Sequence, residues 1–196
     1  MILHDNKNKI KCIISFLIIV ILLNINLLKG QVIKPAKGYT PQIGILVSML
    51  EDLRKRVKNS VRSLNIEETD FLLDEDANRI GAIILHLAAV EKYYQVYTFE
   101  NRTFNKEEEE KWGPALTLGE SARETIIEKP ISYYLKIWND VRTETLRLLK
   151  TKDDIWLSSK VEKSKMNNHW AWFHVMEHQA NHMGQIRLII NRIEKK

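Results

Sequence analysis

Residues 168–193 read NHWAWFHVMEHQANHMGQIRLIINRI and contain four of the chain's six histidines. This stretch has no strand pattern and predicts one long helix. Three other stretches place apolar residues at helical spacing, at residues 40–64, 76–98 and 130–149. Four amphipathic helices without a convincing strand pattern predict an all-α four-helix bundle.

The connection between the second and third helices, residues 99–129, loses this periodicity. It contains a run of four glutamates, Glu107 to Glu110, which predicts a short acidic helix. An antiparallel neighbour needs only a few connecting residues, whereas a long crossover lets two helices run the same way. We therefore expect a bundle with a long crossover connection after its second helix.

The first thirty residues have the layout of a secretory signal peptide, with a lysine-bearing start and an apolar run from Cys12 to Leu23. That run is shorter than the roughly 20 residues that a membrane-spanning helix needs. We expect residues 1–30 to be removed after Gly30, residues 31–39 to form a linker and residues 40–196 to form the bundle. The protein would then be exported, periplasmic or extracellular. An apolar run extended through Leu28 would instead act as a membrane anchor, and this alternative stays open.

Charge gives little support to a nucleic-acid partner. The chain has 30 basic and 25 acidic residues, but residues 1–30 contain four of the lysines and one aspartate, so the remainder has 26 and 24. No basic stripe interleaved with aromatic residues follows. The chain's one cysteine, Cys12, lies in the leader, so the mature protein would have neither a disulfide nor a thiol nucleophile.

Histidines are concentrated on the last predicted helix, at positions 169, 174, 178 and 182. A spacing of four places neighbours one turn apart on one face, so two imidazoles can bind one metal. A partly buried structural histidine is the ordinary alternative. His86 lies within the apolar segment 83–89, where a ring without a partner costs roughly 1–3 kcal/mol. It either bonds to a neighbouring helix or supplies a third ligand from a facing helix.

Two of these histidine segments resemble a known family. Residues 178–186, HQANHMGQI, are similar to the H-x3-H-x-G-Q-I signature of the DinB-like metal-binding bundles, and residues 85–91, LHLAAVE, resemble their second-helix histidine segment. Residues 167–174, NNHWAWFH, resemble exported members. The resemblance covers the chain from about Gly38 to Arg192, with one departure at Met183, where many members have a basic residue.

The resemblance implies that one divalent transition metal binds to His86, His178 and His182, with remaining positions open to water or substrate. Zinc or nickel is the first expectation for the metal, and iron or manganese the second. The implied function is a metal-dependent hydrolase or a transferase that activates a low-molecular-weight thiol. Export slightly favours hydrolysis, because cytosolic thiols are scarce outside the cell. The competing alternative is a non-catalytic metal-binding or ligand-binding module, in which a closed metal shell leaves no room for chemistry.

We therefore expect a small-molecule substrate, no nucleic-acid partner and, unless the leader is kept, no stable membrane partner. A homodimer is an open alternative to a monomer. The sequence assigns no catalytic base and no organic cofactor.

A second motif competes for His178. Residues 174–178, HVMEH, match the H-x-x-E-H pattern of inverzincin peptidases, in which His174 and His178 would bind zinc and Glu177 would act as general base. The pattern is loose, and those peptidases are larger mixed α/β proteins. We expect His174 to pack beside the ligands or to orient one of them.

Smaller expectations concern the neighbours of these motifs. Glu91 should pair with an arginine, Gly184 should let helices approach closely, and Gln185 should hydrogen-bond within the bundle. Five aromatic residues are expected in the core rather than at a ligand, namely Tyr93, Tyr94, Trp170, Trp172 and Phe173.

The first testable prediction concerns the leader. Sequencing the mature N-terminus should find Gln31 or a residue within a few positions of it, because the small Gly30 suits the position before cleavage. An intact chain in the membrane fraction would favour the anchor. A full-length chain in the cytosol would contradict export.

Overall fold

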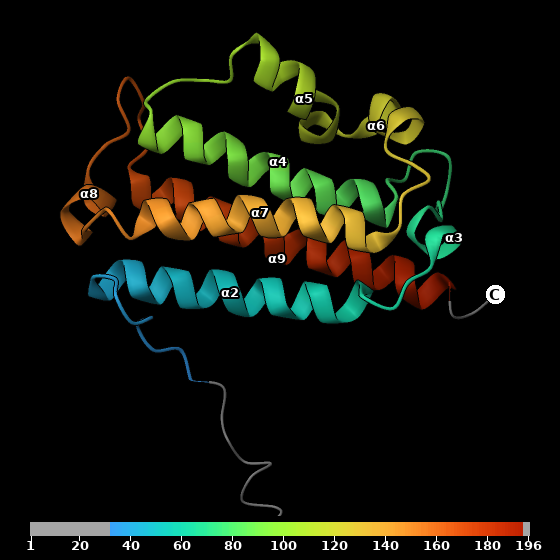
Figure 1. Ribbon diagram of the computed structural model, residues 1–196, viewed down its shortest axis with the longest axis horizontal. Coiled ribbons are helices and arrows are strands. Elements are labelled where there is room, and N and C mark those ends of the chain that lie inside the picture. Colours follow the sequence, from blue (N-terminus) through green and yellow to red (C-terminus); the bar gives the residue numbers. More distant parts are fainter. Residues whose placement is uncertain (1–31, 194–196) are drawn as a thin grey trace, which may run out of the picture. The chain divides into compact units, whose positions relative to one another are not determined.

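The computed structural model describes residues 32–193, and the regular secondary structure of these residues is helical, apart from one isolated bridge between Lys160 and Asn167. Four long helices form the bundle: α2 (Pro41–Val61), α4 (Ile80–Phe99), α7 (Ile131–Leu149) and α9 (Asn168–Ile193) (Figure 1). Shorter helices occupy the connections: α3 (Ile66–Thr69), α5 (Lys106–Thr117), α6 (Gly119–Thr125) and α8 (Asp154–Ser158). The predicted all-α bundle is confirmed.

The long crossover determines which of the long helices are neighbours and in which direction they run. Helix α4 packs against both α7 and α9, and α2 completes the bundle by contacting α9 and α7. Figure 1 shows α4 and α7 running in one direction and α2 and α9 in the other. Residues 100–130, which include α5 and α6, return the chain to the end of the bundle where α4 began. Helix α5 lies against α4 on the way.

The start of α2 is held by a distant residue. Pro41 occupies the first turn, and Thr40 precedes it at the capping position, but the Thr40 side chain makes no bond to the helix. The Thr40 hydroxyl instead donates to Asp154. The Asp154 carboxylate also accepts the backbone N–H groups of Gln42 and Ile43, each at 3.2 Å. A carboxylate at this end of a helix is favoured by the helix dipole, so α8 and α2 stabilise each other.

Helix α4 begins four residues later than the periodicity predicts. Arg79 keeps an extended backbone, and its side chain donates to the carbonyl oxygens of Asp70 at 3.0 Å and Arg123 at 2.7 Å. These two bonds join the start of α4 to the connection that precedes the helix and to the crossover that follows it. Two residues after Arg79, a Cβ atom on Gly81 would lie 2.6 Å from the ring of Tyr134, so this close approach to α7 requires glycine.

Because α5, α7 and α9 all cover it, α4 is buried on most of its surface. Because α4 lies in the interior, each buried polar residue on it needs a hydrogen-bonding partner. Glu91 is 1% exposed and lies against Arg142 of α7, which is fully buried. Two hydrogen bonds join them, from Arg142 Nε at 2.6 Å and from its Nη2 at 2.9 Å. The predicted pairing of Glu91 with an arginine is confirmed.

Further bonds connect this ion pair to the other long helices. Arg142 also donates to Leu50 O and Glu51 Oε1 of α2, both at 3.0 Å, and to Gln179 Oε1 of α9 at 3.2 Å. Trp138 donates to Glu91 Oε2 at 3.2 Å. One guanidinium therefore contacts groups from every other long helix of the bundle, and so it helps to set their register.

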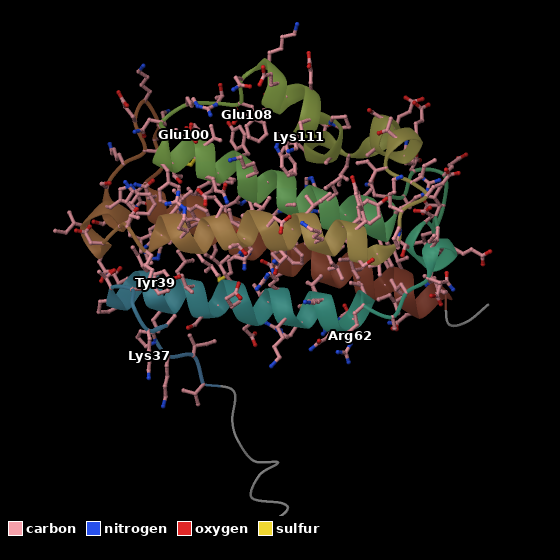
Figure 2. All side chains as sticks on the ribbon, in the orientation of Figure 1. Lys37, Tyr39, Arg62, Glu100, Glu108 and Lys111 are labelled. Atoms are coloured by element: carbon pink, nitrogen blue, oxygen red, sulfur yellow. The ribbon has the colours of Figure 1, made fainter. Side chains whose placement is uncertain are left out.

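The crossover begins with a second arginine. Arg102 donates to Glu100 at 2.8 Å and to Glu108 at 2.6 Å, and Figure 2 shows these two glutamates near each other between the end of α4 and α5. Asn105 and Glu108 cap α5 by exchanging side-chain bonds with each other's backbone N–H groups. The predicted acidic helix is thus present and fastened at its start.

Residues 1–30, which contain the predicted leader, lie outside the described residues. Among the helices of residues 32–193, none combines the length and apolar character that crossing a membrane requires. Even α4 carries Glu91 and Lys92 in the middle of its sequence.

Removing one partner of the buried ion pair should strongly destabilise the bundle. Glu91→Gln leaves the Arg142 charge buried without its counterion, which typically costs about 3–5 kcal/mol. The free energy of unfolding in urea measures this loss. Glu144→Gln is the matched control, because Glu144 pairs with Arg147 on the exposed face of the same α7 helix, and it should change stability by less than about 0.5 kcal/mol. Equal effects of the two substitutions would contradict this role.

Candidate metal centre

His86 enters the centre from the interior of α4, where it is 7% exposed. Its Nδ1 lies 2.8 Å from the carbonyl oxygen of Ala115, in the last turn of α5. A carbonyl oxygen only accepts hydrogen bonds, so Nδ1 carries the proton and Nε2 keeps its lone pair. The crossover therefore fixes which nitrogen of His86 is free to bind a metal.

His182 enters from α9 and is oriented in the same manner. Its Nδ1 lies 2.8 Å from Gln185 Oε1, one turn further along the helix. The predicted hydrogen bond of Gln185 within the bundle is thus confirmed. With Nδ1 donating to the amide oxygen, the Nε2 of His182 also presents a lone pair.

These nitrogens meet at His178. The Nε2 of His178 is 3.1 Å from that of His86 and 3.2 Å from that of His182. One ligand atom from each of the three residues lies within 4.8 Å of the others. The structure therefore brings together the three histidines that the resemblance selects.

The arrangement fits a divalent cation. His86 and His182 both aim a lone pair at His178, whose Nε2 can carry one proton and so can donate to only one of them. A cation between the rings would satisfy all three nitrogens. Tetrahedral zinc, with Zn–N distances of about 2.0–2.1 Å, requires N···N separations of roughly 3.3–3.4 Å, which is near the two observed values.

Burial keeps the three rings neutral, which is the form that binds metal. It lowers the pKa of His86 to about 4 and that of His178 to about 3, and it also lowers the pKa of His182. Repulsion by charge on His182 and on His86 lowers the pKa of His178 further. At neutral pH a metal therefore displaces few protons from these residues.

His174 lies beside the centre but is not part of the convergent group. Its ring stacks on Trp170 at 5.3 Å with an interplanar angle of 3°, and it is 5.6 Å from the ring of His178. Its Nδ1 is 3.6 Å from Glu177 Oε2, and both side chains are partly exposed. This geometry agrees with the expected packing role and does not favour the peptidase motif.

Comparison with known families adds to this geometry. The family model described as Mycothiol-S-transferase matches residues 45–194, which include the three convergent histidines. The chain belongs to the mycothiol-S-transferase family. Its DinB-like helical architecture is the one that the histidine segments predicted. Among curated proteins, none matches the chain.

Within this mycothiol-S-transferase fold, several expectations about the surroundings of the centre are wrong. A Cβ atom on Gly184 would meet nothing within 4 Å, so the residue does not mediate a close approach between helices. Trp170 is 47% exposed and Phe173 is 43% exposed, whereas Trp172 is fully buried. Trp172 lies two positions from Trp170, on the side of α9 that faces the core. The partner of His86, the Ala115 carbonyl, was not predicted, because a backbone oxygen has no signature in the sequence.

Alanine substitutions should separate the ligands from their neighbours. His86→Ala, His178→Ala and His182→Ala should each nearly abolish zinc binding, because each removes one of three ligands. Gln185→Ala should weaken binding by about 10–100-fold, since it removes the bond that orients His182. His174→Ala should retain much of it. Zinc content and competition with a chelator are the measurements, and a His174→Ala variant that loses zinc while His182→Ala keeps it would contradict this assignment.

The metal-free protein should lose stability as the pH falls from about 6.5 towards 4. In that interval the unfolded chain binds a proton at His86 that the folded chain does not bind, so the free energy of unfolding rises with pH. The slope is at most about 1.4 kcal/mol per pH unit for each such histidine, and the contribution is complete above the unfolded pKa. Urea unfolding at several pH values should give a shallower slope for His86→Leu than for the wild type. Equal slopes would contradict the lowered pKa.

Proposed function

We propose that this protein is a divalent-metal-dependent thiol transferase whose metal is held by His86, His178 and His182. Family membership suggests a metal-dependent enzyme of the thiol-transferase kind, and the cluster of three histidines is compatible with it. The observation that supports the proposal most directly is the convergence of three Nε2 atoms of neutral rings on one point. Zinc or nickel suits this donor set best.

A metal at this point would supply Lewis acidity, which lowers the pKa of a thiol or polarises a substrate oxygen. The protein's own residues prepare the centre. The Ala115 carbonyl and Gln185 hold the two outer rings in the required tautomer, and the interior position of His86 and His182 keeps water away from them. His178 is only half-buried, so a small molecule can approach from its side.

The thiol must come from a second molecule. Residues 32–193 contain no cysteine, so the protein has no thiol nucleophile of its own in this part of the chain. We propose a low-molecular-weight thiol and a small electrophile as the two substrates, with no nucleic-acid partner and, unless the leader is kept, no stable membrane partner. The leader predicted for residues 1–30 would lead to export, which would restrict the thiol to one found outside the cytosol.

Metal-dependent conjugation tests this function. Zinc-loaded or nickel-loaded protein should join a thiol, offered as mycothiol, cysteine or glutathione, to monochlorobimane, forming a C–S bond as the C–Cl bond breaks and chloride and the thiol proton are released. His182→Ala should reduce the rate to that without enzyme. His169→Ala is the matched control, because His169 is an exposed histidine of the same helix outside the cluster, and it should keep full activity.

Other outcomes separate the alternatives. Metal-dependent cleavage of esters or amides without a thiol would indicate a hydrolase instead. Tight metal binding with neither activity, together with a metal spectrum that no added thiol changes, would indicate a closed site in a non-catalytic module.

A further inference from the structure

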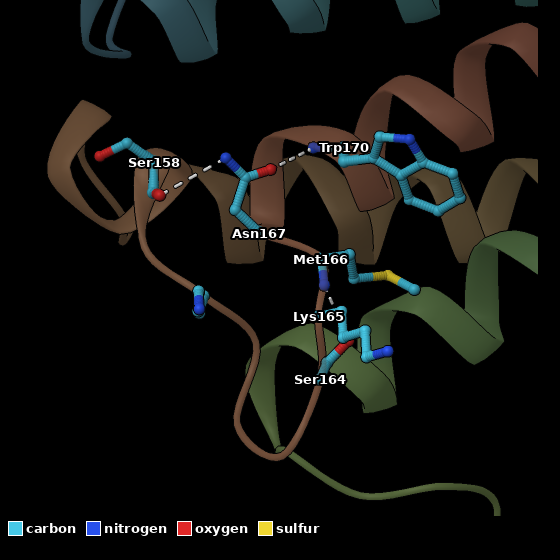
Figure 3. A pocket seen from close by; sticks show the side chains of 7 residues that line it. Ser158, Ser164, Lys165, Met166, Asn167 and Trp170 are labelled. Carbon is cyan, nitrogen blue, oxygen red and sulfur yellow. Dashed lines mark hydrogen bonds between the residues drawn. The ribbon is translucent and has the colours of Figure 1, made fainter.

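A shallow cavity, open to solvent, lies at the start of α9, beside the loop that joins α8 to it. Its volume is about 580 Å³, within the range of small-molecule sites, and Figure 3 shows the side chains that line it. Lys160 and Lys165 contribute positive charge, Met166 and Trp170 contribute apolar surface, and Asn167 contributes an amide. None of the three convergent histidines lines it.

The cavity has the composition of an anion site. Its lining has two lysines and no acidic residue. Neither lysine lies within ion-pairing distance of a carboxylate of the described residues. In Figure 3 the side chains of Lys165 and Met166 extend on the same side of the loop as the ring of Trp170. The lysines could bind the anionic group of a ligand, and Met166 and Trp170 could contact its apolar stem.

Trp170 connects this cavity with the metal centre. Nearly half of its surface is exposed, it lines the cavity, and it stacks on His174 at 5.3 Å. His174 in turn lies 5.6 Å from His178. The cavity and the centre are therefore the two ends of one row of rings on α9. Eight residues separate Trp170 from His178, which corresponds to about 12 Å along the helix axis.

We propose that this cavity is the subsite for the anionic end of the thiol substrate. The inference rests on the proposed function, since the sulfur would occupy the histidine end of the row. The stem of the thiol would lie along Trp170 and His174, and a carboxylate or similar group would reach Lys160 and Lys165. The preferred substrate is therefore an elongated thiol with an anion about 12 Å from its sulfur. The distance between the sulfur and the anionic group of the thiol, and not the sulfur alone, would determine specificity.

Matched probes test the subsite by isothermal titration of the zinc-loaded protein. They are 8-mercaptooctanoate, whose extended length suits the row of rings, its neutral counterpart 8-mercapto-1-octanol, and 3-mercaptopropionate, which is too short to reach the cavity. The wild type should bind 8-mercaptooctanoate about tenfold more tightly than the neutral probe, as expected for charge-assisted hydrogen bonds.

The double variant K160Q/K165Q should remove this preference and leave binding of 3-mercaptopropionate unchanged. Lys163→Gln is the control, because Lys163 belongs to the same loop but does not line the cavity. It should keep the tenfold preference. Circular dichroism of each variant checks that the bundle remains folded.

Two results would overturn the subsite: no preference for the carboxylate in the wild type, or an equal loss in the control, which would mean that only overall charge is sensed. Octanoate, which lacks sulfur, tests the proposed function separately. If octanoate binds as tightly as 8-mercaptooctanoate, the histidines do not hold the sulfur and the thiol-transfer proposal fails. A carboxylate preference that depends on Lys160 and Lys165 would still show the anion site.

Discussion

The buried guanidinium of Arg142 is the constraint on which the arrangement of the bundle depends. A charge without contact with water must be neutralised and hydrogen-bonded, or it costs several kcal/mol. Here Glu91 of α4 neutralises it, and groups of α2 and α9 complete its bonds. Its partner on α9 is Gln179, which directly follows His178. The guanidinium that Glu91 neutralises therefore also holds α9 beside its histidine segment.

The crossover has two roles in this structure. Its length lets α4 and α7 run in the same direction, which places Arg142 and Glu91 on facing helices. It also covers α4 with α5, whose last turn offers the Ala115 carbonyl to His86. Carbonyl groups at the end of a helix lack partners within the helix, so this one is free to orient a ring. A topological feature thus determines which nitrogen of His86 faces the other histidines.

Two separate parts of α9 contribute to the proposed function. Convergence of neutral imidazoles supports a metal centre, and because the described residues contain no cysteine, the proposed thiol transfer would need an external thiol. The exposed Trp170, which the sequence placed in the core, becomes the link between that centre and a basic cavity. Reaction and recognition would then occupy opposite ends of one helix face.

The sequence alone determined much of this protein, because helical periodicity and the spacing of histidines are local properties. It predicted the bounds of α9, the long crossover with its acidic helix and the pairing of Glu91 with an arginine. The family resemblance, carried by two short segments, selected the three histidines that the structure brings together.

Only the tertiary structure decided which faces are covered and which backbone groups meet the side chains. Trp170 and Trp172 are alike in sequence, yet the direction of α9 against its neighbours buries one and exposes the other. The Ala115 carbonyl reaches His86 across 29 positions of the chain, and a basic cavity forms where a loop turns back on the start of a helix. Such contacts join residues far apart in the chain, and no local pattern of residue types encodes them.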